Sequence, residues 1–213
     1  MLMKDCTLTI TGKLESKPYV DLTKAALSLF SGRHSPGYVA VEGDWSNGAF
    51  WLAANTLGSE LSIHGLLVDS LQGDRAVVGI LQQLESGNAT ISVADIPDLV
   101  PILSVVAAAK HGAVFTDIQR LRLKESDRVA SVISMIEALG GKAAATEDTL
   151  TIFPGGLIGG VVDSCNDHRI AMSAAIAATV CTAPVTIVGA EAVNKSYPSF
   201  WAEYRRLGGN YEQ

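Results

Sequence analysis

Cysteine is scarce in this 213-residue chain, with three residues at positions 6, 165 and 181. An odd number of cysteines without a Cys-x-x-Cys pair makes no disulfide framework, so we expect a reducing compartment. Charged residues make up only 18% of the chain, and the net charge of −6 argues against a general nucleic-acid binder. The longest apolar run, 170–180, is too short to span a membrane, and the first residues do not resemble a signal peptide. These absences favour a cytoplasmic protein.

Hydrophobic residues make up 48% of the chain, enough for a real core. Helical patterns cover residues 19–30, 48–57, 73–84, 98–109, 127–139, 169–181 and 198–207. Strand-like patterns cover residues 6–12, 38–41, 61–63, 89–93, 113–116, 142–145, 150–153 and 185–188. The order strand, helix, strand, helix, strand, strand recurs. It predicts an α/β (α+β) fold of repeated βαβαββ units packed around buried helices, with a plain doubly wound sheet as the alternative.

The segment RLRLKESDR, residues 120–128, concentrates four cations and two carboxylates in an otherwise acidic chain. Its first half can be the end of a strand with the leucines facing inward. Its second half can be a helix start, where the helix dipole favours carboxylates such as Glu125 and Asp127. Alternatively, Lys124 and Arg128 bind a phosphate or carboxylate, and a neighbouring carboxylate serves as acid or base. The local basic cluster indicates a small anionic ligand.

Further polar residues stand at the starts of other predicted helices. Arg169 opens an apolar helix, where a buried guanidinium needs a partner or a ligand, and Asn166 or Asp167 can cap the same helix. Asp98 opens another apolar helix, where capping is its ordinary role. His168 has no second metal ligand at a suitable spacing. If these helix starts converge, they form a pocket for a ligand with more than one phosphate or carboxylate.

Seven motifs occur along the chain in one order: SKPY, VEGDWSN, SLQGD, DIPD, KESDR, CNDHRIAM and NKSYPSFW. From about residue 8 to the end, this order resembles the EPSP synthase family of enolpyruvyl transferases. The resemblance implies an enolpyruvyl transferase-like lobe. It also implies transfer of the enolpyruvyl group of phosphoenolpyruvate to the 5-hydroxyl of shikimate 3-phosphate, with release of phosphate, in the shikimate pathway. No metal or organic cofactor, nucleic acid or membrane is implied.

The motifs also imply residue roles. Asp98 of DIPD resembles the base that takes the hydroxyl proton, and Glu125 of KESDR resembles the acid that handles the methylene proton of phosphoenolpyruvate. The remaining matches are substrate-binding residues: Arg128, Arg169 and Lys195 for phosphoenolpyruvate, and Lys124, Ser16 and Tyr19 for shikimate 3-phosphate. No role carries over to Arg120 or Arg122.

The match covers only the C-terminal half of the family's length, and the chain is shortened near residues 31–34. We therefore expect residues 1–43 to be a remnant of the other lobe, with one partial repeat, and residues 44–213 to form the C-terminal-half lobe. On this interpretation the missing N-terminal half is a partner, and the chain alone is inactive. The alternatives are a non-catalytic anion-binding or interaction module on the same lobe, and a small enzyme that completes its site by dimerisation.

Overall fold

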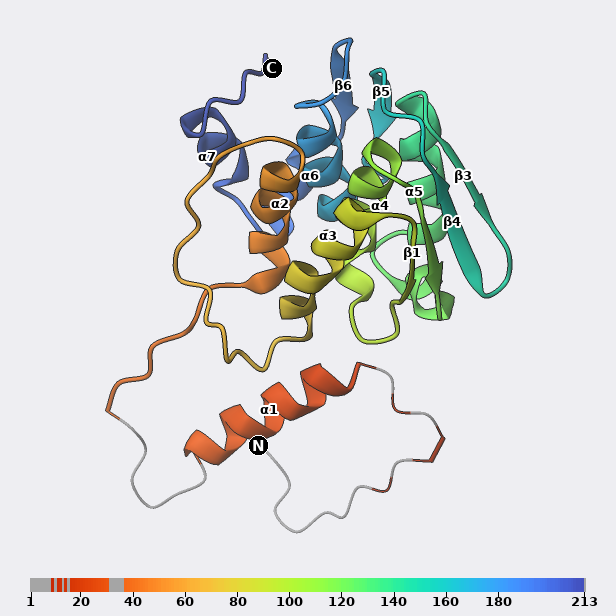
Figure 1. Cartoon of the computed structure of the whole chain (residues 1–213). Helices are drawn as coiled ribbons and strands as arrows, with labels where there is room; N and C mark the ends of the chain where they lie inside the picture. The colour runs from red at the N-terminus through yellow and green to blue at the C-terminus, as the bar shows by residue number, and fades with distance from the viewer. Residues whose placement is uncertain (1–8, 10, 13, 15, 31–36, 213) are drawn as a thin grey trace.

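The computed structural model describes residues 9, 11–12, 14, 16–30 and 37–212. From α2 (Trp45–Thr56) onward, the chain forms one body with helices in the middle and strands along one side (Figure 1). The first helix, α1 (Lys17–Phe30), lies outside this body. No helix in the described part of the chain is long and apolar enough to cross a membrane.

A complete βαβαββ unit occupies the middle of the chain. It consists of β1 (Ala89–Ser92), α4 (Val100–Ala109), β2 (Ala113–Thr116), α5 (Arg128–Ala138), β3 (Lys142–Ala145) and β4 (Thr149–Phe153). These strands form one sheet in the order β1-β2-β4-β3. Strand β2 pairs in parallel with β1, because helix α4 connects the two strands. A tight turn after β3 reverses the chain, so β4 runs antiparallel to both of its neighbours, β3 and β2.

The next segment repeats the beginning of that order with β5 (Gly160–Asp163), α6 (His168–Ala177), β6 (Val185–Val188) and α7 (Phe200–Arg206). Strands β5 and β6 form a parallel two-stranded sheet. The predicted α/β fold with repeated units is therefore confirmed, with a full βαβαββ in the first unit and βαβα in the second.

Buried helices form the centre of the body. All ten residues of α6 are buried, as are the first nine of α4. These two helices pack against each other and against α2 (Figure 1). Their sequences, such as VPILSVVAAA for α4, lack a polar face that could meet water, so burial on all sides follows from composition. Before the first unit, η1 (Gly73–Ala76) leads into α3 (Val77–Ser86), which also packs on α2.

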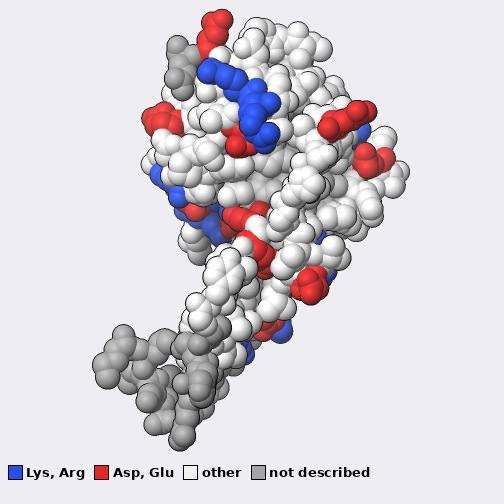
Figure 2. Space-filling model, turned by 90° about the vertical axis from the view of Figure 1, so that its left-hand side faces the viewer, with Lys and Arg blue, Asp and Glu red and all other residues white. Residues whose placement is uncertain are grey.

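The start of helix α1 contacts the body through hydrogen bonds and through Pro18, which lies against Gly73. None of its residues is buried. The backbone amide of Lys17 donates to Asp95 Oδ1 at 3.0 Å, and the Tyr19 hydroxyl donates to Asp98 Oδ2 at 3.1 Å. Its far end leaves Leu27, Leu29 and Phe30 between 44% and 58% exposed. Figure 2 shows a largely uncharged face, with acidic side chains grouped at the narrow waist below the main body.

Two predicted strands are wrong, and the possible strand end before Lys124 is not a strand either. Residues 38–41 form no strand: Tyr38 and Val41 are 85% and 92% exposed, and none of the described strands pairs with this segment. Residues 61–63 form none either, because the Asn55 side chain satisfies both the N–H and the C=O of Leu61. The segment before Lys124 is the 3-10 helix η3 (Gln119–Leu123), which buries Leu121 and leaves Leu123 84% exposed.

Other boundaries shift without changing the topology. The first predicted strand, 6–12, falls mostly outside the described residues. Helix α6 ends at Ala177 rather than at residue 181, and strand β5 has no counterpart in the sequence prediction. The β5 segment follows two glycines, which weaken a strand pattern.

Candidate active site

Turns at the helix starts bring the predicted catalytic residues together. Asp98 lies in η2 (Pro97–Leu99), directly before α4. Lys124 and Glu125 lie between η3 and α5, Arg128 is the first residue of α5, and Arg169 is in the first turn of α6. Because the helices start at one end of the body, their side chains and N-terminal dipoles converge there.

Asp98 is the centre of this cluster, and its carboxylate meets three cations. Arg128 Nη1 lies 2.5 Å and Lys124 Nζ 3.0 Å from Oδ1, and Arg169 Nη2 lies 3.3 Å from Oδ2. The Tyr19 hydroxyl of α1 adds a fourth donor. Asp98 therefore does not cap α4, as a helix-start aspartate ordinarily would, but balances the positive charge of the site.

Arg128 is fully buried, and its guanidinium forms ion pairs with three acids. Besides Asp98, its Nη2 donates to Glu125 at 2.5 Å and its Nε donates to Asp167 at 2.9 Å. Asp167 is itself completely buried and caps α6 by accepting from the Arg169 backbone amide. A buried guanidinium requires such pairing, because an uncompensated charge in the interior is costly.

The electrostatic environment keeps both buried aspartates ionised. Burial alone opposes ionisation of Asp98, but Arg169, Arg128 and Lys124 together hold its pKa well below the usual range. Burial likewise opposes ionisation of Asp167, and its pKa is held low mainly by Arg128. The pKa of Tyr19 is raised, first by burial and then by the negative charges of Asp74 and Asp98, so its hydroxyl keeps its proton.

A pocket of about 270 Å³ opens beside this cluster, and we call it the Asp98 pocket. Its walls come from α1, the start of α2, η1, η2 and α6, and its lining residues are Pro18, Tyr19, Leu22, Asp44, Ser46, Gln72, Gly73, Asp74, Asp98 and Arg169. Arg169 is 8% exposed, and its Nε and Nη1 are buried without a hydrogen-bond partner in the described part of the chain. Unpaired guanidinium donors in a pocket wall favour an anionic ligand.

The remaining predicted site residues lie at the edge of the cluster. Lys195 is exposed at the end of η4 (Ala190–Lys195), and its ammonium donates to the Asn166 carbonyl at 2.5 Å, next to the start of α6. Ser16 is buried just before α1, and its hydroxyl accepts from Arg120 Nη1. Arg120, which no motif assigned, thus ties the segment before α1 to η3.

Sequence reasoning missed two acids. Asp167 was considered only as a helix cap, and it is also the buried partner of Arg128. Asp74 of SLQGD received no role, and it is buried in the wall of the Asp98 pocket. In both cases the available signal was an acid at a helix start.

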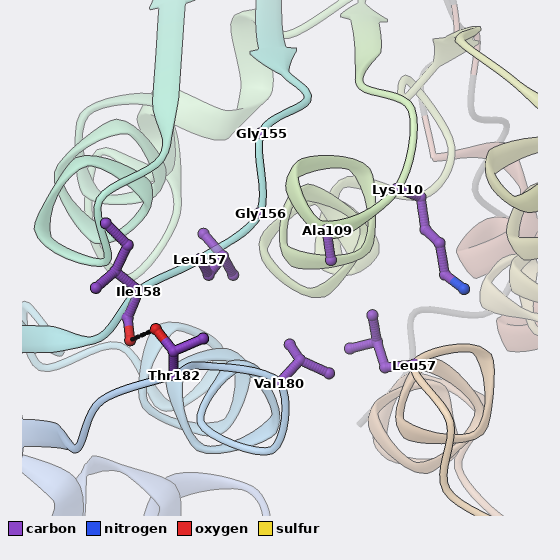
Figure 3. Close-up of a pocket in the computed structure, with 9 residues that line it drawn as sticks. All are labelled: Leu57, Ala109, Lys110, Gly155, Gly156, Leu157, Ile158, Val180 and Thr182. Carbon is purple, nitrogen blue, oxygen red and sulfur yellow. Dashed lines mark hydrogen bonds between the residues drawn. The ribbon is translucent and has the colours of Figure 1, made fainter.

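A larger pocket, of about 430 Å³, lies where α2, α4 and α6 end, away from the starts that carry the charged cluster (Figure 3). Its lining residues are Leu57, Ala109, Lys110, Gly155, Gly156, Leu157, Ile158, Val180 and Thr182. Lys110 is the only ionisable residue among them, so this pocket has no acid or base pair for chemistry. No described residues form a group of three or more His, Cys, Asp or Glu able to hold a metal ion.

Residues 85–204, which include Asp98, Asp167 and the cations that surround them, match the family model of EPSP synthase (3-phosphoshikimate 1-carboxyvinyltransferase). The chain belongs to the EPSP synthase family. Its members are enzymes, and the sequence resemblance to this family is thereby confirmed. The match covers both repeated units of the fold.

Two 3-phosphoshikimate 1-carboxyvinyltransferases from Clostridium illustrate the relationship. That of C. novyi is 39% identical over 240 residues, and that of C. kluyveri is 37% identical over 247. The alignments cover 96% and 100% of this chain but 55% and 58% of the relatives. The chain thus spans little more than half the length of these EPSP synthases.

The solved EPSP synthase of Acinetobacter baumannii shares the fold. Its structure superimposes with a TM-score of 0.72 at 26% identity, covering 81% of this chain and 47% of that protein. A second structure of EPSP synthase from the same organism gives a TM-score of 0.69. The α/β architecture described above is therefore that of EPSP synthase.

Proposed function

We propose that residues 44–213 form one lobe of an enzyme that transfers the carboxyvinyl group of phosphoenolpyruvate to the 5-hydroxyl of shikimate 3-phosphate and releases phosphate. The observation that carries this proposal is the Asp98 carboxylate, which is held by Lys124, Arg128 and Arg169 beside an open pocket. The family membership supports the reaction, and the charge pattern supports two anionic substrates.

Asp98 is the base that removes the proton of the attacking hydroxyl. In the described structure three cations stabilise its charged form, so it holds a proton only weakly. When anionic substrates bind to those cations, the compensation of Asp98 falls and its pKa rises toward the range of an effective base. Asp98 therefore becomes an effective base only after the substrates have bound.

Glu125 donates the proton to the methylene carbon of phosphoenolpyruvate. Its side chain is 40% exposed and is positioned by Arg128, which also holds Asp98. Acid and base are therefore fixed relative to each other through one buried guanidinium. Arg128, Arg169 and Lys195 bind phosphoenolpyruvate, and Lys124, Ser16 and Tyr19 contribute to the shikimate 3-phosphate site. These cations offset the repulsion between two anions and stabilise the charge that shifts during the addition.

The site residues come from one lobe and the segment at α1, so we propose that the chain requires the complementary N-terminal half and does not turn over substrates alone. A chimera provides the test. Residues 44–213 replace the corresponding segment of the C. novyi relative, and the chimera is assayed for phosphate release from the two substrates. We expect activity in the chimera and none in the isolated 213-residue chain.

Two variants of the chimera test the assigned roles. Asp98→Asn should lower kcat by about 10² to 10⁴, as expected for loss of a general base. Arg169→Ala should raise the KM for phosphoenolpyruvate by about 10 to 100-fold, the cost of a lost charged hydrogen bond. An unchanged KM in Arg169→Ala contradicts its role. A folded chimera that binds both substrates without turnover favours the non-catalytic anion-binding module instead.

A further inference from the structure

A second buried carboxyl lines the Asp98 pocket, and the proposed mechanism does not use it. Asp74 in η1 is 3% exposed. Its Oδ2 accepts a hydrogen bond from the Ser46 hydroxyl, in the first turn of α2. Its Oδ1 is buried and has no hydrogen-bond partner among the described residues. Asp74 shares the pocket with Arg169, whose Nε and Nη1 are also unpartnered.

The groups around Asp74 disfavour a negative charge there. The pKa of Asp74 is raised to about 6, first by burial and then by the charges of Asp98 and of Asp44, the N-cap of α2. The Ser46 hydrogen bond and the positive charge of Arg169 lower it. Tyr19 faces the same pocket from α1 as a neutral phenol. Arg169, the cation in this wall, forms its ion pair with Asp98.

An anion that binds to the free donors of Arg169 adds negative charge to a pocket that already contains two carboxyls. We propose that Asp74 takes up one proton from solvent when an anion enters the pocket, and that the resulting carboxylic acid donates a hydrogen bond from Oδ1 to that anion. This inference rests on the proposed function only in that the pocket binds anionic substrates. The O–H bond of the acid, made with the solvent proton, is the one bond that forms, and no bond between heavier atoms forms or breaks.

Protonation of Asp74 gives the two neighbouring carboxyls different tasks. Asp98 stays ionised because three cations surround it, and it remains available as a base. Asp74 becomes neutral, so it no longer repels the anion and supplies a hydrogen-bond donor in the wall of the same pocket. Environments that separate the pKa values of paired carboxyls in this way distinguish acid from base roles in enzymes.

The test uses the whole chain and sulfate, whose charge stays at −2 between pH 4.5 and 8, at constant ionic strength. Carboxyl-carbon NMR follows the titration of Asp74 with and without sulfate. We expect sulfate to move the midpoint of Asp74 upward by about one pH unit, which corresponds to about tenfold weaker sulfate binding at pH 8 than at pH 5.

Three variants separate Asp74 from its neighbours. Asp74→Asn should bind sulfate with nearly constant affinity, apart from any contribution of His168, which also titrates beside Arg169. Ser46→Ala removes the hydrogen bond to the charged form and should move the midpoint of Asp74 upward even without sulfate. The control, Asp69→Asn, removes an exposed acid of the preceding loop and should keep the full pH dependence.

The outcomes distinguish this inference from the proposed function. If sulfate binds but the Asp74 midpoint stays in place, or if Asp74→Asn retains the full pH dependence, the role of Asp74 is wrong and the enzyme assignment stands. If sulfate does not bind at any pH, the anion pocket itself is contradicted, and the proposed function fails with it.

Discussion

Arg128 is the residue on which the charge balance of the site depends. It is fully buried and pairs with Asp98, Glu125 and Asp167. Arg128→Met keeps most of the volume but leaves the buried Asp167 without its main charged partner and removes one of the three cations around Asp98. We expect a loss of about 3 to 5 kcal/mol in the free energy of unfolding, measured by urea denaturation at pH 7.

The matched control is Arg122→Met in the same segment. Arg122 is exposed, and its guanidinium lies 3.5 Å from Asp127 on the surface. Exposed pairs of this kind contribute about 0 to 1 kcal/mol, so the control should change stability by less than that. Equal losses in the two variants would mean that burial of the Arg128 cluster does not contribute to stability.

The raised pKa of Asp74 predicts a pH dependence of stability opposite in sign to that of Asp98 and Asp167. Its pKa in the folded chain, about 6, lies above its usual 3.8, so the folded state holds this proton more tightly than the unfolded state. The protonated Asp74 side chain therefore makes its full contribution to the free energy of unfolding at low pH, and this contribution is lost as the pH rises toward and through 6. Relative to Asp74→Asn, the wild-type chain should lose about 1.4 kcal/mol between pH 5 and pH 7.5.

This prediction is checked by urea denaturation of both proteins at the two pH values. Asp98 and Asp167 have lowered pKa values, so they contribute stability that is lost as pH falls. Because both proteins contain them, their effect cancels in the difference. A difference that stays constant with pH would show that Asp74 titrates normally.

Motifs located the cations of the site together with Asp98 and Glu125, but not the buried acid Asp167, which also positions Arg128. Lys124, Arg128 and Arg169 stood out because guanidinium and ammonium groups are rare in apolar surroundings. Asp167 did not, since an aspartate before a helix is explained by capping alone, and its side chain does cap α6. Its pairing with Arg128 depends on how two helices from different repeats meet, a distance that no local pattern encodes.

At the scale of elements, glycines show where the fold limits substitution. Gly112 joins α4 to β2 with a φ of +78°, and a Cβ there would lie 2.8 Å from both Ile152 O and Pro154 Cδ. Gly112→Ala should therefore lower the free energy of unfolding by about 1 kcal/mol or more. Gly79→Ala, in the first turn of α3 with nothing within 4 Å of the added Cβ, should instead raise it by about 0.5 to 1 kcal/mol.

Urea denaturation of the two variants measures both effects under one condition. The two variants should change the free energy of unfolding in opposite directions. A general preference for alanine in this fold would instead stabilise both variants. A stable Gly112→Ala variant would mean that the turn after α4 relaxes into another conformation.

The helices were predictable because long apolar patterns and caps specify them locally. Asp44 and Asp127 cap α2 and α5 by accepting backbone N–H groups, as their sequence context indicates. The strands were less predictable, because a strand exists only where a partner lies beside it. The apolar residues of 38–41 have no partner among the described strands, whereas β5 pairs with β6 despite its glycines.

At the scale of the whole molecule, α1 and the elements that follow residue 44 differ in burial. The segment before residue 44 contributes α1, which buries none of its residues and touches the body through hydrogen bonds to Asp95 and Asp98. The central helices and both sheets lie after it. We therefore propose that residues 44–213 are the independent folding unit and that α1 belongs to the complementary lobe.

Deletion of residues 1–43 tests this division. The shortened chain should keep the far-ultraviolet circular dichroism of folded helices and lose no more than about 1 to 2 kcal/mol of stability, the value of a few exposed hydrogen bonds. Glu42, which accepts from the Ser70 hydroxyl, is removed as well, so Glu42→Ala in the full chain is the matched control for that contact. If the shortened chain unfolds or loses cooperativity while Glu42→Ala stays stable, then α1 is an integral part of this lobe, and the boundary at residue 44 is wrong.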